Sequence, residues 1–198
     1  MTRTRKSFKT VDLVLVSMFA ALMAIGANVS SFLVIGAVPI TLQTLFSILA
    51  GALLGSRLGA LSMTVYLLVG LVGFPVFSQF RGGLGYLLSP TLGFLLSYIL
   101  VSFVIGMIVE KSKKKSLSTF MVACFAGLFI NYAVGTNYMY YALQLIANLD
   151  AVSYKVAWSW MVAPFIKDTI LTIFAALLAK RIYHVVQKKA NHSPKKAA

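Results

Sequence analysis

Lys167 and Asp168 stand side by side within a mostly apolar stretch, residues 156–179. An ionisable side chain beside lipid is costly unless it is paired, so such residues usually serve a function. Neighbours on a helix point about 100° apart, so we expect the two not to stack and each to face another polar group. A buried lysine can bind a carboxylate, and a buried aspartate can accept hydrogen bonds from amide or ureido N–H groups. The pair therefore predicts a ligand site, with polar packing between helices as the alternative.

A glycine-rich segment, residues 73–91, carries a further cation, Arg81. The segment contains the runs GFPVF at 73–77, RGGLG at 81–85 and SPT at 89–91. Irregular backbone is tolerated in a membrane protein only where it lines a cavity or is buried in protein. We expect this segment to lie on the outer side and to close over a ligand.

Asn131 and Tyr132 begin a polar and aromatic run that continues to Tyr141. Tyrosine and tryptophan are common at the membrane interface, which explains most of this run and also Trp158 and Trp160. Asn131 is expected to lie deeper than that belt, where an amide needs partners. We therefore expect Asn131 and Tyr132 to line the same cavity as Lys167 and Asp168.

Enzymatic chemistry finds little support among the remaining residues. None of the 14 glycines is followed by lysine, so the sequence has no P-loop for ATP. His184 and His192 belong to the basic tail, far in sequence from any embedded metal ligand or nucleophile. The other acidic residues, Asp12, Glu110 and Asp150, are expected outside the apolar spans, so Asp168 has no carboxylate partner. The sequence predicts no enzyme, no metal site and no cofactor.

The composition identifies the elements that must position these residues. Of the 198 residues, 60% are hydrophobic and 11% are charged, and the mean hydropathy is +0.89. A membrane-spanning helix needs about 20 apolar residues, and such stretches begin near residues 11, 40, 58, 91, 117 and 156. We predict an all-α integral membrane protein with six transmembrane helices. Gly55, Arg57 and Gly59 mark a tight turn between the second and third helices. One long helix at this place would leave five membrane spans.

Basic residues favour six spans with both termini in the cytoplasm. This topology leaves only Arg81, Lys155 and Lys167 of the 18 lysines and arginines off the cytoplasmic side, as the positive-inside rule expects. The net charge of +14 then reflects topology and contact with anionic lipid, not nucleic-acid binding. We predict one membrane domain over 1–198, with a cytoplasmic N-terminus (1–10), a six-helix core (11–182) and a disordered tail (183–198), in the plasma membrane of a bacterium.

The first apolar stretch has small residues at helical spacing, Ala20, Ala24 and Ala27. Such a face lets another helix approach closely. The contact can be with a partner protein or with another helix of the same chain, and the spacing alone does not separate the two.

Taken in order, several motifs resemble the BioY family, the biotin-binding S components of energy-coupling-factor (ECF) transporters. The motifs are VPITLQTL at 38–45, LAGALLGSRLG at 49–59, GFPVF at 73–77, GGLG at 82–85 and SPTLGF at 89–94. The resemblance covers nearly the whole chain. It implies six helices with cytoplasmic termini, in agreement with the charge pattern, and a ligand site toward the outside.

The resemblance also implies roles for single residues. Asp168, in the segment 163–168, matches the acidic ligand residue of the family. Many relatives place a lysine where this chain has Leu171, so the carboxylate of the ligand is left to Lys167 or Arg81. Asn131 is implied as a further contact. The region of Ala20 and Ala24 resembles the face that docks on the transmembrane coupling subunit.

The function implied is biotin capture, with Asp168 accepting from the ureido ring and one cation neutralising the carboxylate. ATP would be used only by partners, namely a coupling subunit and two ATPase subunits. Two alternatives remain. One is an S component for another vitamin or precursor, and the other is an intramembrane enzyme acting on lipid.

Overall fold

The computed structural model describes residues 9–145 and 152–192, most of which are helical. Five helices are long and apolar enough to cross a membrane, namely α1, α2, α3, α4 and the part of α6 up to Val185. The protein is thus an all-α membrane protein with one two-residue β-hairpin. In chain order the elements are α1 (Thr10–Asn28), β1 (Val34–Ile35), β2 (Val38–Pro39), α2 (Gln43–Val72), the 3-10 turns η1 (Ser78–Phe80) and η2 (Leu84–Leu88), α3 (Leu92–Lys111), α4 (Leu117–Leu145), α5 (Tyr154–Trp160) and α6 (Val162–His192).

Helix α2 is a helical hairpin that reverses at Gly55. The backbone there has φ 85° and ψ 179°, a conformation that L side chains rarely adopt. A Cβ atom on Gly59 would lie 3.0 Å from Gly51 Cα, although the two residues would be about 12 Å apart in a straight helix. The predicted tight turn is therefore confirmed. Counted separately, the two arms of α2 (43–54 and 56–72) join α1, α3, α4 and α6 as the six predicted helices, and α5 is a short addition.

Glu110 at the end of α3 fixes this reversal. Its carboxylate accepts hydrogen bonds from the backbone N–H of Ser56 at 2.8 Å and from Ser56 Oγ at 2.7 Å. The first N–H groups of a helix lack partners inside the helix. Glu110 therefore caps the second arm of α2 and ties the turn to α3.

The expected single helix from residue 156 to 179 is divided in the structure. Ser153 caps α5 with its side chain, and α5 ends at Trp160. Pro164 lies in the first turn of α6, where its ring would clash with the carbonyl of residue 160 in a continuous helix. The division therefore follows from Pro164.

The predicted end of the core at residue 182 falls within a helix. Helix α6 continues past residue 182 to His192, so residues 183–192 are helical and are not a disordered tail. The parts of the predicted terminal segments at 1–8 and 193–198 lie outside the described residues.

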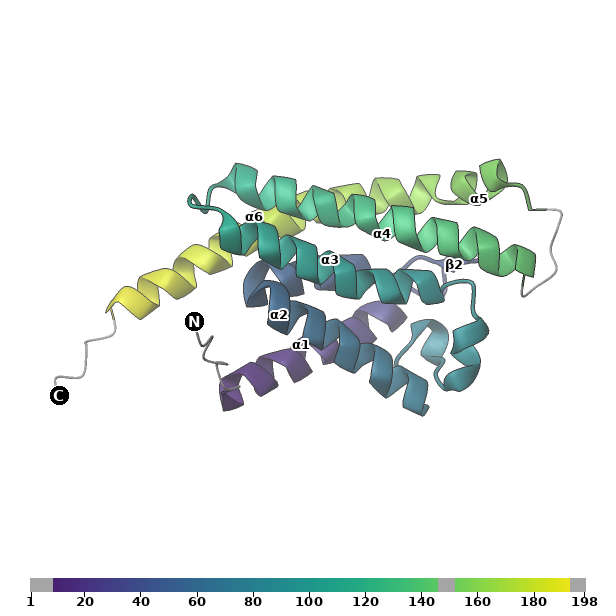
Figure 1. Cartoon of the computed structure of the whole chain (residues 1–198), viewed down its shortest axis with the longest axis horizontal. Helices are drawn as coiled ribbons and strands as arrows, with labels where there is room; N and C mark the ends of the chain where they lie inside the picture. The colour runs from purple at the N-terminus through teal and green to yellow at the C-terminus, as the bar shows by residue number, and fades with distance from the viewer. Residues whose placement is uncertain (1–8, 146–151, 193–198) are drawn as a thin grey trace, which may run out of the picture.

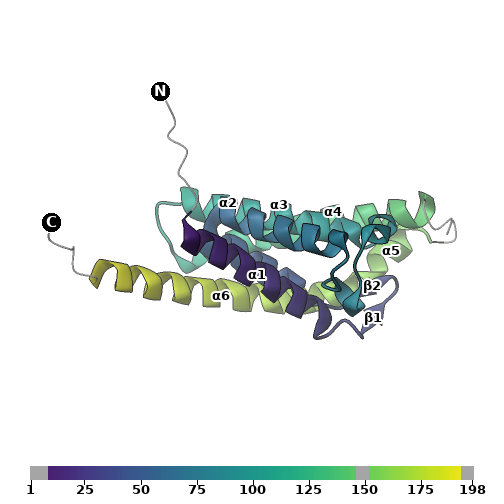
Figure 2. The same cartoon turned by 90° about the horizontal axis from the view of Figure 1, so that it is seen from below.

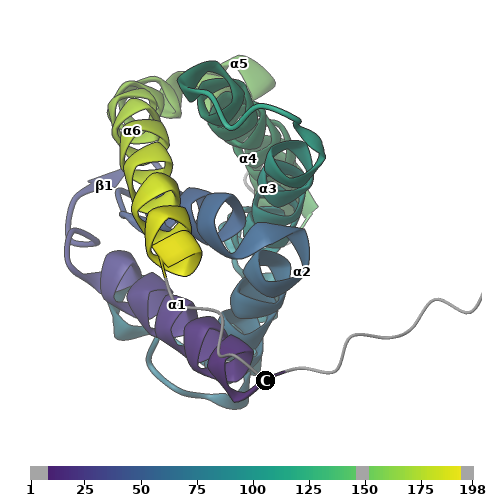
Figure 3. The ribbon, with the colours of Figure 1, turned by 90° about the vertical axis from the view of Figure 1, so that its left-hand side faces the viewer.

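The helices surround a common core and run along one axis (Figures 1 and 3). α2 packs against α1, α3 and α6, and α4 packs against α3 and α6. The β-hairpin and α5 lie at one end, whereas the start of α1, the α3–α4 connection and the end of α6 lie at the other (Figures 1 and 2). Large apolar side chains cover the exterior, as expected for a bundle solvated by lipid.

Candidate ligand-binding site

A pocket lies near the β-hairpin end of the bundle. It is bounded by the hairpin and the start of α2 on one side and by α3, α4 and α6 on the others, with an empty volume of about 510 Å³ that partly opens to solvent. Four of the five residues predicted to bind a ligand line it: Asn131, Tyr132, Lys167 and Asp168. The complete lining is Val38, Pro39, Ile40, Thr41, Gln43, Thr44, Ser78, Tyr86, Thr91, Phe94, Leu95, Tyr98, Asn131, Tyr132, Met161, Pro164, Lys167 and Asp168.

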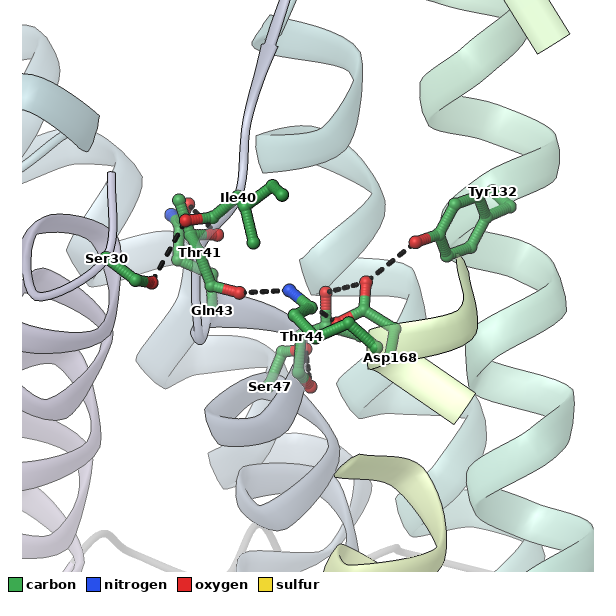
Figure 4. Close-up of polar contacts among 9 residues, drawn as sticks. Ser30, Ile40, Thr41, Gln43, Thr44, Ser47, Tyr132 and Asp168 are labelled. Carbon is green, nitrogen blue, oxygen red and sulfur yellow. Dashed lines mark hydrogen bonds and ion pairs between the residues drawn. The ribbon is translucent and has the colours of Figure 1, made fainter. Parts of the chain in front are cut away.

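Asp168 is the polar centre of this pocket and is only 3% exposed. Its Oδ2 accepts hydrogen bonds from Tyr132 Oη at 2.8 Å and from Thr44 Oγ1 at 3.2 Å, so α2, α4 and α6 meet at one carboxylate (Figure 4). Oδ1 is buried, and its partner among the residues that the structure describes is the ammonium group of Lys167, which lies 2.8 Å away as an ion pair. One oxygen of Asp168 is therefore held by two hydroxyl groups and the other by an ion pair, and Oδ1 keeps a lone pair that can accept a hydrogen bond from a ligand.

Lys167 forms an ion pair with its neighbour in sequence, contrary to the prediction that each would face another group. Lys167 Nζ lies 2.8 Å from Asp168 Oδ1. The two Cα–Cβ bonds do diverge on the helix, but the long lysine side chain bends back across the helix surface. Nζ also donates to the backbone carbonyl of Thr41. The ammonium group is thus held beside the carboxylate at the edge of the pocket.

The start of α2 supplies polar residues that the sequence analysis did not assign to the site. Thr41 Oγ1 donates to Gln43 Oε1 at 3.1 Å, and Gln43 Nε2 donates to Tyr66 Oη at 2.9 Å. Tyr66 in turn donates to the carbonyl of Val76 at 3.0 Å, which ties the pocket to the glycine-rich segment. The signal was present, since Thr41, Gln43 and Thr44 form a polar cluster in a mainly apolar stretch.

Asn131 is buried in the wall that α3 and α4 share. Its Oδ1 accepts from Ser97 Oγ at 2.7 Å. No hydrogen bond to Asn131 Nδ2 occurs within 9–145 and 152–192, so the amide nitrogen is an available donor beside the pocket. Tyr132, the next residue, holds Asp168 and packs edge-on against Phe165 at a centroid distance of 5.2 Å.

Arg81 is the one predicted ligand residue that lies outside this pocket. It is exposed and lines a separate, open depression with Pro75, Phe80 and Ser89. Tyr86 lines both cavities, so Arg81 lies on the far side of that ring.

Ala20 and Ala24 lie on α1, away from the pocket. Both are half-buried and pack against the core of the chain itself. Ala27 is fully buried, and the small residues that α1 exposes include Ser17 and Ala21. Part of the small-residue face therefore serves internal packing.

The described part of the chain contains no group of three or more histidine, cysteine, aspartate or glutamate residues that could hold a metal. The pocket itself is built from hydrogen bonds, one ion pair and apolar walls. A helical membrane bundle with such a small, partly polar pocket is a binding protein for a small solute. The chain belongs to the BioY family, whose model matches residues 1–188, and the resemblance seen in the sequence motifs is confirmed.

Curated relatives match along almost their full lengths. The chain is 42% identical to the probable biotin transporter BioY of Lysinibacillus sphaericus, covering 91% of this chain and 90% of that protein. It is 40% identical to the putative biotin transporter BioYB of Bacillus subtilis (strain 168), covering 93% of each.

A solved structure shares the fold. It is the crystal structure of an S-component for biotin from an ECF-type ABC transporter, with a TM-score of 0.68 and 23% sequence identity, covering 93% of this chain and 95% of that one.

Proposed function

We propose that this protein captures biotin at the outer face of the bacterial plasma membrane, as the S component of an ECF transporter. Its family and the names of its relatives support this assignment. The observation that carries it is the close pair of a buried acceptor and a donor, Asp168 Oδ1 and Lys167 Nζ, 2.8 Å apart in one pocket.

A cyclic urea is complementary to such a pair. The ureido ring of biotin presents a carbonyl oxygen flanked by two N–H groups. Lys167 can donate to the carbonyl while Asp168 Oδ1 accepts from the adjacent N–H. Hydrogen bonds to charged groups are the stronger ones, particularly away from water. Asn131 Nδ2 is a second donor within the same pocket.

The rest of the biotin molecule needs apolar walls and one cation. Phe94, Leu95, Tyr98 and Met161 supply the walls for the thioether ring. Because Lys167 already serves Asp168 and the ureido carbonyl, we assign the valerate carboxylate to Arg81. Arg81 lies beyond Tyr86, on the side of the open depression, where the valerate chain of biotin would leave the pocket.

The orientation in the membrane follows from charge. The α2 reversal, whose sequence includes Arg57, and the lysine-rich α3–α4 connection lie at the same end as the start of α1 and the end of α6 (Figure 1). The positive-inside rule places that end in the cytoplasm. Both termini are then cytoplasmic, the whole chain is one membrane domain, and the pocket faces outward.

We assign the energy for uptake to other subunits, and the absence of a P-loop from the sequence supports this assignment. We assign ATP hydrolysis to two ATPase subunits that act through a transmembrane coupling subunit, with no cofactor in this chain.

The contact with the coupling subunit is assigned to α1 near Ala20 and Ala24. Because these two are half-buried, Ala24→Trp should disturb both the core and the contact. Ala21→Trp, on the exposed side, separates the two effects: it should weaken subunit association and leave biotin binding intact.

Equilibrium binding to the purified protein tests the proposal. Labelled biotin should bind saturably and be displaced by unlabelled biotin, but not by other vitamins at the same concentration. Displacement by another vitamin and not by biotin would assign the pocket to that vitamin. Turnover of a lipid that Asp168→Asn abolishes, with its binding unchanged, would favour the enzyme alternative.

A further inference from the structure

A second cavity lies on the opposite side of one wall of the polar pocket. It is a groove between α4 and the α5–α6 break, with an empty volume of about 810 Å³ that includes space open to the exterior. Tyr132 and Met161 line both cavities. We call it the α4–α6 groove; its lining is Phe129, Tyr132, Ala133, Trp158, Met161, Val162, Phe165 and Ile166.

The α4–α6 groove opens on the exterior of the bundle. Phe129 is 65% exposed, Val162 59% and Ile166 58%, although all three are large apolar side chains. They belong to α4 and α6, both of which are long and apolar enough to cross a membrane. Lipid chains are therefore the natural surroundings of this groove.

One end of the groove lies at the level of an aromatic belt. Tyr140, Tyr154 and Trp158 form a chain of edge-to-face ring contacts, with centroid distances of 5.2 Å and 6.2 Å. Tyr154 Oη also donates to Asn137 Oδ1 at 3.1 Å. Belts of tyrosine and tryptophan lie at the boundary between headgroups and acyl chains. The Trp158 end of the groove is thus at the depth where the ester groups of phospholipids lie.

Trp158 carries a polar atom that the protein leaves without a partner. Its Nε1 is buried and forms no hydrogen bond with any part of the chain that the structure describes. An indole N–H can only donate, and a buried donor usually has an acceptor. The ester carbonyl of a phospholipid is an acceptor available at this depth.

We propose that the α4–α6 groove binds one phospholipid of the outer leaflet. An acyl chain lies along Phe129, Ala133, Phe165 and Ile166. The Trp158 indole, which is buried at Nε1 in this structure, turns toward the groove so that an ester carbonyl accepts from this atom. The site does not depend on which solute fills the polar pocket. The groove does share Tyr132 with that pocket. The bound acyl chain therefore supports the Tyr132 ring, whose hydroxyl donates to Asp168.

Photocrosslinking tests the site directly. The full-length protein is placed in nanodiscs that contain a phosphatidylglycerol with a diazirine on one acyl chain, and crosslinked peptides are mapped by mass spectrometry. We expect crosslinks to concentrate on residues 129–133 and 158–166. Ala133→Trp fills the groove from its exposed side. It should lower crosslinking there about tenfold, because the acyl chain of the lipid loses its contact surface in the groove.

Val122→Trp is the matched control, since Val122 is on the same helix, 64% exposed and outside the groove. It should leave crosslinking in the groove unchanged. Trp158→Phe keeps an aromatic, though smaller, side chain and removes the N–H, and it should reduce crosslinking about three- to tenfold, the usual worth of one buried hydrogen bond. Crosslinks spread evenly over all exposed helix faces, or a groove signal that survives Ala133→Trp, would overturn the proposal whether or not biotin binds.

Discussion

Tyr132 Oη donates to Asp168 Oδ2 at 2.8 Å, joining α4 to α6 at the centre of the polar pocket. Thr44 shares this oxygen, whereas Oδ1 of the same carboxylate is paired with Lys167 Nζ at 2.8 Å. The tyrosine is therefore a positioning residue, because it fixes the direction in which Oδ1 and its ion pair with Lys167 face the pocket.

Tyr132→Phe should weaken biotin binding about three- to thirtyfold, since a hydrogen bond to a charged group contributes about 1.5–3 kcal/mol and Thr44 retains part of the support. Isothermal titration with biotin measures the change. Tyr141→Phe is the matched control, because Tyr141 is 60% exposed and does not line the pocket. Equal effects of the two substitutions would contradict the positioning role.

The two cations should respond differently to the charge of the ligand. Lys167→Met removes a donor to the ureido ring, so it should weaken biotin and biotin methyl ester by the same factor, about tenfold or more. Arg81→Gln should weaken biotin but not the uncharged ester. Competition binding with both ligands on both variants measures these factors. If Lys167→Met affects only the acid, the lysine binds the carboxylate and our assignment of the two cations must be exchanged.

The α2 reversal should be sensitive to one methyl group. Gly55→Ala places a Cβ atom 2.2 Å from Glu110 Oε1 at a residue with φ 85°, which should lower the stability by about 2 kcal/mol or more. Thermal unfolding in detergent should show a loss of several degrees. Gly85→Ala has open space around the new Cβ and should be nearly neutral. Unchanged stability of Gly55→Ala would mean that the turn is not held as described.

Accessibility of single cysteines tests the orientation. The sequence has one cysteine, Cys124, which is fully buried and can be replaced by alanine. In that background, Leu84→Cys should react with a membrane-impermeant maleimide on intact cells, and Lys114→Cys should react only after the cells are opened. The opposite pattern would invert the proposed topology.

Composition and charge were sufficient for the helical membrane architecture, because lipid exposure imposes long apolar stretches. The reversal at Gly55 was also predictable, since glycine spacing and Arg57 together are unusual in a straight span. Pro164 could have predicted the break between α5 and α6, but the apolar composition on both sides concealed it. The extension of α6 to His192 was missed because a lysine-rich tail resembles a disordered one.

The site was predictable in part for a physical reason. Buried polar residues such as Asn131 and Asp168 stand out in an apolar sequence, so their convergence could be expected. The Lys167–Asp168 ion pair could not be predicted, because it depends on the path of the flexible lysine side chain and not on helix spacing. The place of Arg81 depends on the course of the glycine-rich segment, which no periodicity describes.

The most direct test is a calorimetric titration of purified wild-type protein and Asp168→Asn with biotin. Asparagine keeps the size of the side chain and removes the charge that the ureido N–H and Lys167 require. We predict saturable one-to-one binding to the wild type and a loss of affinity of about tenfold or more in the variant, with the folded state retained. Equal affinity of the two proteins, or no binding of biotin to the wild type, would contradict the account.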